Sequence, residues 1–316
     1  MEPAPYHAEV TTFGEGEAFW LEAEDGVRIR LGLWRAEAPR GTMLMFPGRT
    51  EFVEKYAHVA AEMTARGFDM IAVDWRGQGL ADRLHPNPLT GHVDDFADYQ
   101  RDVTAVMAAV SDLGLARPWH VVGHSMGGCI GLRALIDGRL DVATCGFTAP
   151  MWGISMAPAL RPVAWGLSTL SRPFGFSSIF APGQKPAPYV QRADFETNTL
   201  TSDREMYERL RHMVTEVPGL GLGGPSLHWL RAALVEMRAL DRLPSPDLPC
   251  LTFCGEDEMV VDKTRIARRM ARWPNGELEW IAGGRHELFL ETPEIRGHVI
   301  ARLTEHFETA PARAAA

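Results

Sequence analysis

Ser125 lies in the five-residue pattern Gly123-His-Ser-Met-Gly127, which follows an apolar run and precedes a helical pattern. Glycines on both sides of the serine let the chain turn sharply without Cβ clashes, and the turn lifts the hydroxyl above the end of the strand. The start of the next helix directs the backbone N–H of Met126 toward the point where an oxyanion would form. Gly-Ser turns also arise by chance in long chains, but the strand before this one and the helix after it indicate a nucleophile for acyl transfer.

A serine hydroxyl is a weak nucleophile, so it needs a general base, and a carboxylate must hold that base in one tautomer. A serine at such an elbow is followed along the chain by the carboxylate and then by the histidine, each in a loop after a strand. His286 follows the last strand-like run and is preceded by two glycines, so it is the predicted base. His124 adjoins the serine, but the elbow points its side chain elsewhere, which indicates a structural role.

The carboxylate should come from the loop Gly255-Glu-Asp-Glu-Met-Val260, which follows a strand-like run. Asp257 is the favoured acid and completes the predicted triad with the serine and the histidine. Three neighbouring carboxylates remain open as alternatives: Glu256, Glu258 and Asp262.

A second oxyanion donor is expected from the loop Pro47-Gly-Arg-Thr-Glu51, which ends another strand-like run. Gly48 lets the backbone turn its amides inward, and the N–H of Arg49 is the predicted donor. The alternative interpretation of this loop is an ordinary turn at the end of a strand.

The elements that would position these residues alternate between strands and helices, which predicts an α/β fold with a mostly parallel sheet and helices on both faces. The runs at 19–24 and 27–34 are expected to form an antiparallel pair. Further strands are predicted at 42–48, 68–74, 119–123, 142–150, 248–256 and 277–284, and helices at 54–66, 94–113, 126–137, 262–272 and 293–308. After residue 150 the strand alternation stops, so we expect a core of residues 1–150 and 246–316 and an inserted helical cap of residues 151–245.

The composition excludes some partners. With 32 Lys+Arg against 41 Asp+Glu the net charge is −9, so no broad basic surface is available for nucleic acid. The start of the chain lacks the pattern of a signal peptide and no apolar run is long enough for a membrane span, which predicts a cytoplasmic protein with at most transient, peripheral contact at the inner membrane surface.

The four cysteines are expected to be buried, reduced thiols. Cys250 and Cys254 share one face of a predicted strand, but no further cysteine or histidine with ligand spacing lies near them. We therefore predict no metal site and no cofactor.

At these residues the chain resembles the lysophospholipase and monoacylglycerol-lipase branch of the α/β-hydrolases, along nearly its whole length. The matching stretches include PGRTEFVEKY (47–56), GHSMGG (123–128), GGPSLHWL (223–230) and GRHELFLE (284–291). The resemblance implies the α/β-hydrolase fold, the triad Ser125, Asp257 and His286, and Arg49 and Met126 as oxyanion donors. One departure is Pro47, which stands where much of the wider family has a histidine.

The cap is expected to contact the substrate. Within residues 151–180 the only charges are Arg161 and Arg172, which suits an acyl chain, because each buried CH₂ contributes roughly 0.8 kcal/mol. The alternative is that these apolar groups only pack the cap on the core. The predicted substrate-binding residues are Trp152, Trp165, His228 and Trp229.

The leading hypothesis is therefore a serine hydrolase that cleaves acyl esters through an acyl-enzyme, as a lysophospholipase or monoacylglycerol lipase does. A small-ester carboxylesterase or thioesterase is the alternative, and a non-catalytic binding protein is less favoured because all three catalytic residue types are present in order. Ser125 argues against dehalogenases and epoxide hydrolases of this fold, which use an aspartate nucleophile. Oligomeric state is not addressed by the sequence.

Overall fold

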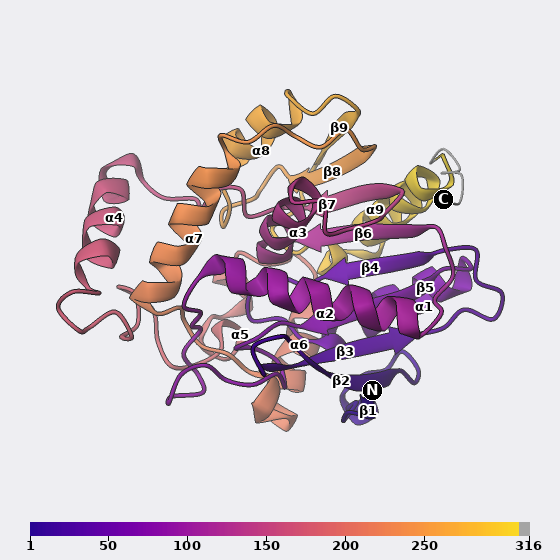
Figure 1. Ribbon diagram of the computed structural model, residues 1–316, viewed down its shortest axis with the longest axis horizontal. Helices are drawn as coiled ribbons and strands as arrows, with labels where there is room; N and C mark the ends of the chain where they lie inside the picture. The colour runs from indigo at the N-terminus through magenta and orange to yellow at the C-terminus, as the bar shows by residue number, and fades with distance from the viewer. Residues whose placement is uncertain (310–316) are drawn as a thin grey trace.

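In the computed structural model, which describes residues 1–309, one nine-stranded sheet forms the centre of the molecule (Figure 1). Its order is β1-β2-β3-β5-β4-β6-β7-β8-β9. The strands are β1 (Glu2–Pro3), β2 (Glu17–Glu22), β3 (Arg28–Trp34), β4 (Thr42–Phe46), β5 (Asp69–Asp74), β6 (Trp119–His124), β7 (Thr144–Thr148), β8 (Cys250–Gly255) and β9 (Gly276–Ile281). From β5 to β9 the neighbours run parallel, whereas β1, β2 and β3 join antiparallel. The mostly parallel sheet predicted from the sequence is confirmed, and the two-residue β1 is an addition to it.

Helices cover both faces of the sheet, as expected. One face packs on α1 (Ala57–Ala65) and α9 (Pro293–Glu308), and the other on α2 (Tyr99–Asp112), α3 (Met126–Ile136) and α8 (Lys263–Met270). The period of two along a strand decides which side chain goes where. In β4, Met43 and Met45 join the core of the first face, and Leu44 and Phe46 join the core of the second.

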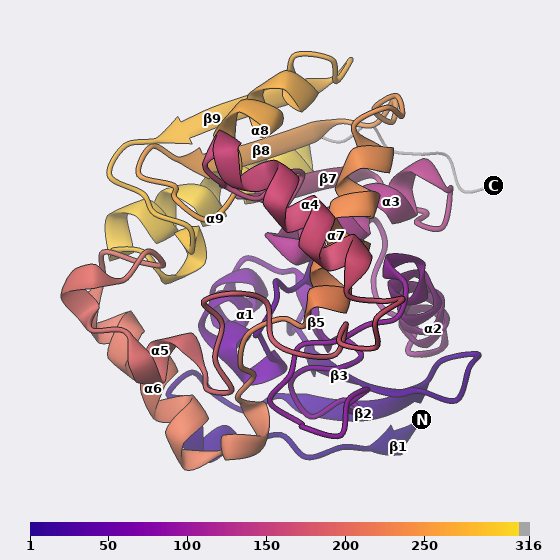
Figure 2. The same cartoon turned by 90° about the vertical axis from the view of Figure 1, so that its left-hand side faces the viewer.

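Between β7 and β8 the chain leaves the sheet and forms helices. They are α4 (Arg161–Leu170), α5 (Tyr189–Arg192), α6 (Arg204–Glu216) and α7 (Leu227–Leu240). Figure 2 shows α4 crossing over α7 on one side, with α5 and α6 on the other. The helix α7 buries Trp229, Ala233 and Met237 in the same core as α2 and α3, so this part of the proposed cap packs as a layer of the core.

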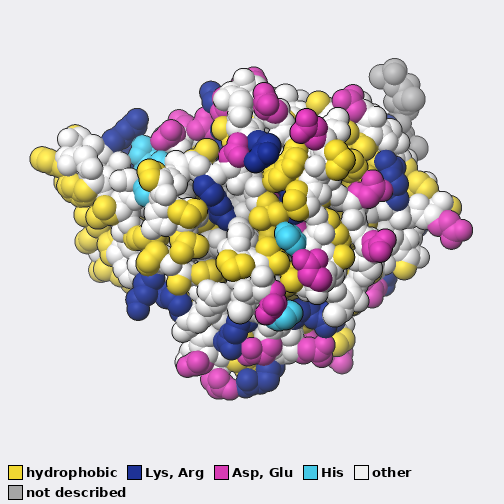
Figure 3. Space-filling model, turned by 90° about the horizontal axis from the view of Figure 1, so that it is seen from below, with side chains coloured by type: hydrophobic (Ala, Val, Ile, Leu, Met, Phe, Trp, Pro, Cys, Tyr) yellow, Lys and Arg dark blue, Asp and Glu magenta, His cyan; other side chains and the backbone are white. Residues whose placement is uncertain are grey.

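The two halves of this insertion differ in what they bury. The helices α5 and α6 form a core of their own, in which Tyr207 and Leu210 pack with Phe52 and Leu290 from the loops beside the sheet. The helix α4 instead projects from the molecule, and apolar side chains gather over the projecting end in Figure 3. Leu160, Val163 and Leu170 are each more than half exposed there. In residues 1–309 no helix is both long and apolar enough to span a membrane.

Candidate active site

The serine elbow stands at the end of β6, where α3 begins at the next residue. Ser125 has φ 48° and ψ −116°, a strained conformation for a residue with a side chain. Close packing explains the glycine that follows, because a Cβ at Gly127 would lie 1.9 Å from the carbonyl oxygen of Phe46. The elbow is also tied to the end of β7, since the Ser125 N–H donates to the Thr148 carbonyl at 3.1 Å. The strain is therefore held by strands on both sides.

His286 reaches the serine from the loop after β9. Its Nε2 lies 3.0 Å from Ser125 Oγ, and its Nδ1 lies 2.7 Å from Glu258 Oε2. The imidazole is 4% exposed, so water competes little for either contact. The structure thus brings the predicted nucleophile and base together, in the geometry that a general base requires.

The acid beside His286 is Glu258, and the expectation of Asp257 is corrected here. Asp257 is exposed, and its backbone N–H donates to the Gly284 carbonyl at 3.0 Å. Glu258 is buried, and its second oxygen, Oε1, accepts the N–H groups of Val260 and Val261. Burial alone would raise the pKa of Glu258, but the charge and hydrogen bond of His286 and these two amides hold it below its ordinary value.

The other two carboxylates that the sequence left open do not contact His286 either. Glu256 is exposed. Asp262 caps α8, where its side chain accepts from the N–H groups of Thr264 and Arg265. The capping role was readable from the sequence, because an aspartate directly before a helical pattern is a typical N-cap.

The predicted oxyanion loop lies beside the elbow because β4 and β6 are parallel neighbours, with Phe46 opposite Gly123. Two buried side chains hold its backbone: Trp75 Nε1 donates to the Pro47 carbonyl at 3.0 Å, and Gln78 Nε2 to the Gly48 carbonyl at 2.7 Å. The Gly48 N–H donates to the loop's own Glu51 carboxylate. Arg49 lies in the loop after β4 and Met126 follows Ser125 after β6, so the two amides come from the ends of neighbouring strands. Their role as oxyanion donors stays a prediction.

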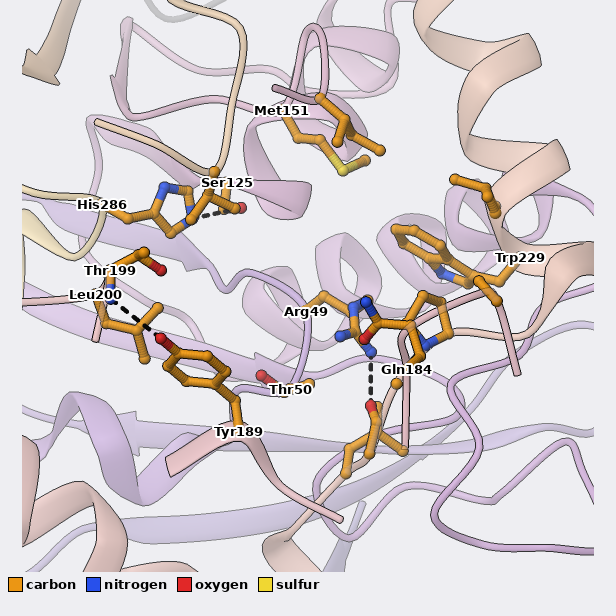
Figure 4. A pocket seen from close by; sticks show the side chains of 18 of the residues that line it. Arg49, Thr50, Ser125, Met151, Gln184, Tyr189, Thr199, Leu200, Trp229 and His286 are labelled. Carbon is orange, nitrogen blue, oxygen red and sulfur yellow. Dashed lines mark hydrogen bonds between the residues drawn. The ribbon is translucent and has the colours of Figure 1, made fainter. Parts of the chain in front are cut away.

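A cavity of about 590 Å³ opens at Ser125 and His286 (Figure 4). Its lining is mostly apolar and comes from both halves of the insertion. One wall includes Leu160, Val163, Ala164 and Leu167 from α4 and the turn before it, and the other includes Tyr189, Val190, Leu210 and Val214 from α5 and α6. The site therefore joins an acyl-transfer geometry to a cavity with room for an apolar chain.

A family model described as "Serine aminopeptidase, S33" matches residues 37–293 of the chain. The chain belongs to this family of α/β-hydrolases. It is similar to lysophospholipase L2 of Escherichia coli strain K12, with 28% identity covering 94% of this chain and 91% of the relative. It is also similar to a probable lysophospholipase L2 of Haemophilus influenzae, with 27% identity covering 85% and 84%. Among solved structures, the chain is similar to a soluble variant of monoglyceride lipase from Saccharomyces cerevisiae in complex with a substrate analogue. The TM-score is 0.74 at 19% identity, and the match covers 98% of this chain and 100% of the lipase, so the two proteins share a fold.

Of the four predicted substrate-binding residues, Trp229 lines the cavity of this hydrolase and the other three do not. Trp152 is buried beneath the elbow, where its Nε1 donates to the Gly128 carbonyl at 3.1 Å and its ring stacks on Trp273. Trp165 lies on the opposite face of α4, against Arg231 and Arg238 of α7. Sequence reasoning placed both tryptophans in the right segment but could not tell which face of it they occupy.

His228 also points away from the cavity. Its Nε2 lies 2.8 Å from the Asp94 carbonyl, and its ring lies 5.2 Å from that of His92. Adjacent residues on a helix face directions about 100° apart, and here Trp229 faces the cavity whereas His228 does not. The residues that line the cavity from α4 and the turn before it are small or aliphatic. Their positions, 160, 163, 164 and 167, have the spacing of one helix face, and this spacing can be recognised in the sequence.

Beside Ser125 and His286 lies a buried charged cluster of Glu51, Lys55, His124 and Glu287. Lys55 Nζ contacts Glu51 and lies 2.6 Å from Glu287 Oε2, while His124 Nε2 lies 3.3 Å from the same oxygen. Burial would raise the pKa of Glu287, but Lys55 and His124 hold it well below its ordinary value. Burial would lower the pKa of His124, yet Glu287 and Glu51 raise it overall. The structural role predicted for His124 is thus one partner in this cluster.

The two carboxylates and His124 offer ligand atoms within 4.8 Å of one another, which is a spacing that could suit a metal ion. The ammonium of Lys55 already lies against both carboxylates and supplies the positive charge that a metal would bring. We therefore assign the cluster to an ion-pair network. All four cysteines are free and buried, and Cys250 and Cys254 both lie in β8.

Proposed function

We propose that this hydrolase cleaves carboxylic esters of a single acyl chain, with a lysophospholipid or monoacylglycerol as substrate, through an acyl-enzyme on Ser125. One observation carries the proposal: the hydrogen-bonded series Ser125, His286 and Glu258 opens directly into a large, mostly apolar cavity. The names of the relatives support the same chemistry and substrate class.

In the proposed reaction Ser125 Oγ attacks the ester carbonyl carbon while His286 Nε2 accepts the hydroxyl proton. Glu258 stabilises the imidazolium through Nδ1, and the N–H groups of Arg49 and Met126 donate to the carbonyl oxygen as it gains charge. His286 then gives the proton to the departing glycerol oxygen, and the C–O bond breaks to leave an acyl-serine. Water attacks this ester in the same way, which releases the fatty acid and returns the proton to Ser125.

The shape of the cavity favours one acyl chain over a small ester. A short acyl group would leave the apolar walls from α4 and α6 unfilled, whereas each buried CH₂ of a longer chain adds roughly 0.8 kcal/mol. A diacyl lipid needs room for two chains. The alternatives that the substrate test must distinguish from this function are a small-ester carboxylesterase and a thioesterase.

Contact with lipid aggregates is part of the proposal. The turn and helix of α4 expose Leu160, Val163 and Leu170, and Phe174 just beyond is 71% exposed. Some of these residues also line the cavity, so substrate would pass from an aggregate along the same apolar surface. With a net charge of −9 the chain gains no general attraction to anionic membranes, which keeps the contact transient. The cytoplasmic location remains a prediction, which fractionation would test.

The test is a panel of lysophosphatidylethanolamine, monoacylglycerol, diacyl phospholipid, acyl thioester, short p-nitrophenyl esters and a peptide amide, at matched concentrations. We expect fatty acid release from the single-chain lipids. S125A and H286A should each lower kcat by about 10⁴- to 10⁶-fold, and the double variant little further, because the residues act as a unit. Turnover of short esters alone would overturn the lipid assignment, and more than a tenth of wild-type activity in S125A would overturn the mechanism.

A further inference from the structure

Arg49 is a charged side chain of the cavity wall that lacks a charged partner. Its Nη1 donates to the Gly223 carbonyl at 2.9 Å, and its guanidinium carbon lies 5.6 Å from the centre of the Trp229 ring. Among residues 1–309 no carboxylate oxygen lies within the 4.0 Å of an ion pair with it. The Glu51 and Glu287 carboxylates, which also line the cavity, are already paired with Lys55.

The surroundings disfavour the charge without removing it. Loss of water around the guanidinium lowers the pKa of Arg49 to about 10, so the group stays a cation at neutral pH. The guanidinium is partly buried, and a partly desolvated charge without a counterion has a free-energy cost that is recovered when an anion binds. A guanidinium suits phosphate in particular, because its N–H groups can donate two parallel hydrogen bonds to phosphate oxygens.

The position of Arg49 relates this cation to the ester. Its backbone lies in the predicted oxyanion loop, and its side chain extends into the cavity between Ser125 and Trp229 (Figure 4). From backbone nitrogen to guanidinium carbon the side chain spans six bonds on the order of 1.5 Å each. A lysophospholipid with its acyl chain on the terminal glycerol carbon has the same number of bonds between the ester carbonyl carbon and phosphorus. One residue can therefore meet the carbonyl oxygen through its N–H and the phosphate through its side chain.

We propose that the Arg49 guanidinium binds the phosphate of a single-chain glycerophospholipid and so makes this hydrolase selective for charged over neutral single-chain lipids. The inference rests on the proposed function, of which it names the substrate class. The phosphate is bound and not transferred. Arg49 is in this respect a specificity-determining residue, separate from the part its backbone has in the oxyanion loop.

The first test compares two substrates that share an acyl chain, decanoyl lysophosphatidylethanolamine and decanoylglycerol. The measured quantity is the ratio of their kcat/KM values. R49M keeps the backbone N–H and an unbranched apolar stem but removes the charged guanidinium, and we expect it to lower this ratio by about tenfold or more. R49K keeps a charge without the planar fork and should recover part of the ratio.

The control is R242M, because Arg242 is exposed in the turn after α7 and does not line the cavity. It should change the ratio by less than about threefold, as expected for a screened surface charge. An equal loss on both lipids in R49M would show a purely structural role for Arg49. An unchanged ratio in R49M, or an equal change in R242M, would also overturn the proposal.

The second test measures binding without turnover. Calorimetry of decanoyl lysophosphatidylethanolamine, below its micelle concentration, should give a Kd about tenfold or more weaker for the S125A/R49M double variant than for S125A. Equal Kd values would overturn the phosphate site even if wild-type protein cleaves lipids. Conversely, failure of wild-type protein to cleave any ester would overturn the proposed function, while a difference in Kd would still support the phosphate site.

Discussion

At the scale of single residues, Glu258 and Asp257 are chain neighbours in opposite environments. Glu258 is buried against His286 with two backbone amides on its other oxygen, whereas Asp257 faces solvent. A carboxylate orients a catalytic imidazole only when it is held at hydrogen-bond distance, so the two acids should differ sharply in their effect on the reaction.

We expect E258Q to lower kcat by roughly 10³- to 10⁴-fold, because a neutral amide can stabilise the wrong tautomer and cannot balance the imidazolium. D257N is the matched control and should stay within about threefold of wild type, since surface substitutions perturb little. The measurement is kcat on one p-nitrophenyl ester, with circular dichroism to verify the fold. A large loss in D257N with a small loss in E258Q would reverse the assignment of the acid.

At the scale of elements, α4 forms one wall of the cavity with residues spaced at three and four along the helix. Ala164 lines the cavity, whereas Leu170, six residues later, faces solvent. A larger side chain at position 164 would occupy part of the cavity, so only a shorter acyl chain should fit beside it.

We expect A164W to lower kcat/KM for long-chain p-nitrophenyl esters by about tenfold or more relative to the acetate, which corresponds to the loss of about two buried CH₂ groups. L170W places the same indole outside the cavity and should leave the profile of kcat/KM against chain length as in wild type. Equal losses on acetate and long esters in A164W would mean that α4 does not bind the acyl chain.

The loops after β4 and β9 and the end of β6 are joined by the cluster of Glu51, Lys55, His124 and Glu287. Removing its lysine leaves two buried carboxylates with less compensating charge. We expect K55M to destabilise the protein by about 3–5 kcal/mol, the usual result of breaking a buried ion pair from one side.

Urea unfolding monitored by tryptophan fluorescence measures this change. K185M, which removes an exposed lysine, should alter the free energy of unfolding by less than about 0.5 kcal/mol. Adding Glu287→Gln to K55M should restore part of the loss, because one uncompensated charge is removed. If K55M and K185M unfold alike, the cluster does not hold these loops together.

At the scale of the whole molecule, buried histidines tie the stability of the fold to pH. Burial lowers the pKa of His120 to about 3 and that of His58 to about 4. Because these folded-state values lie below the ordinary 6.5, the stability that each neutral imidazole contributes is fully present above pH 6.5. It is lost as the pH falls, since protonation then favours the unfolded chain.

We therefore expect the free energy of unfolding to fall steeply from pH 6.5 toward pH 4, and less steeply in H120N. F307L is the matched control: Phe307 stacks on His120 at 4.3 Å, so the substitution loosens the same contact while keeping the imidazole. It should lower stability at each pH without flattening the dependence. Parallel curves for wild type and H120N in urea unfolding at several pH values would contradict the assignment.

The sequence by itself determined the order of the elements, the serine elbow and the loop that carries His286. Each of these depends on local information: the spacing of apolar residues, the glycines that permit a turn, and the strand that precedes a loop. The resemblance of the motifs extended this to the family. Predicted helices such as 293–308 agree with α9, because an amphipathic period is a property of the segment alone.

Only the tertiary structure decided which side chains meet. In one short loop, Asp257 is exposed whereas Glu258 is buried against His286, and the loop is bonded to a distant segment through the Asp257 N–H and the carbonyl of Gly284, 27 positions later. Trp152 and Trp165 belong to the predicted apolar segment, yet Trp273 and the arginines of α7 take their rings away from the cavity. The unpaired charge of Arg49 is likewise visible only after folding. Side-chain direction in loops and at helix faces depends on distant partners, which local sequence patterns do not contain.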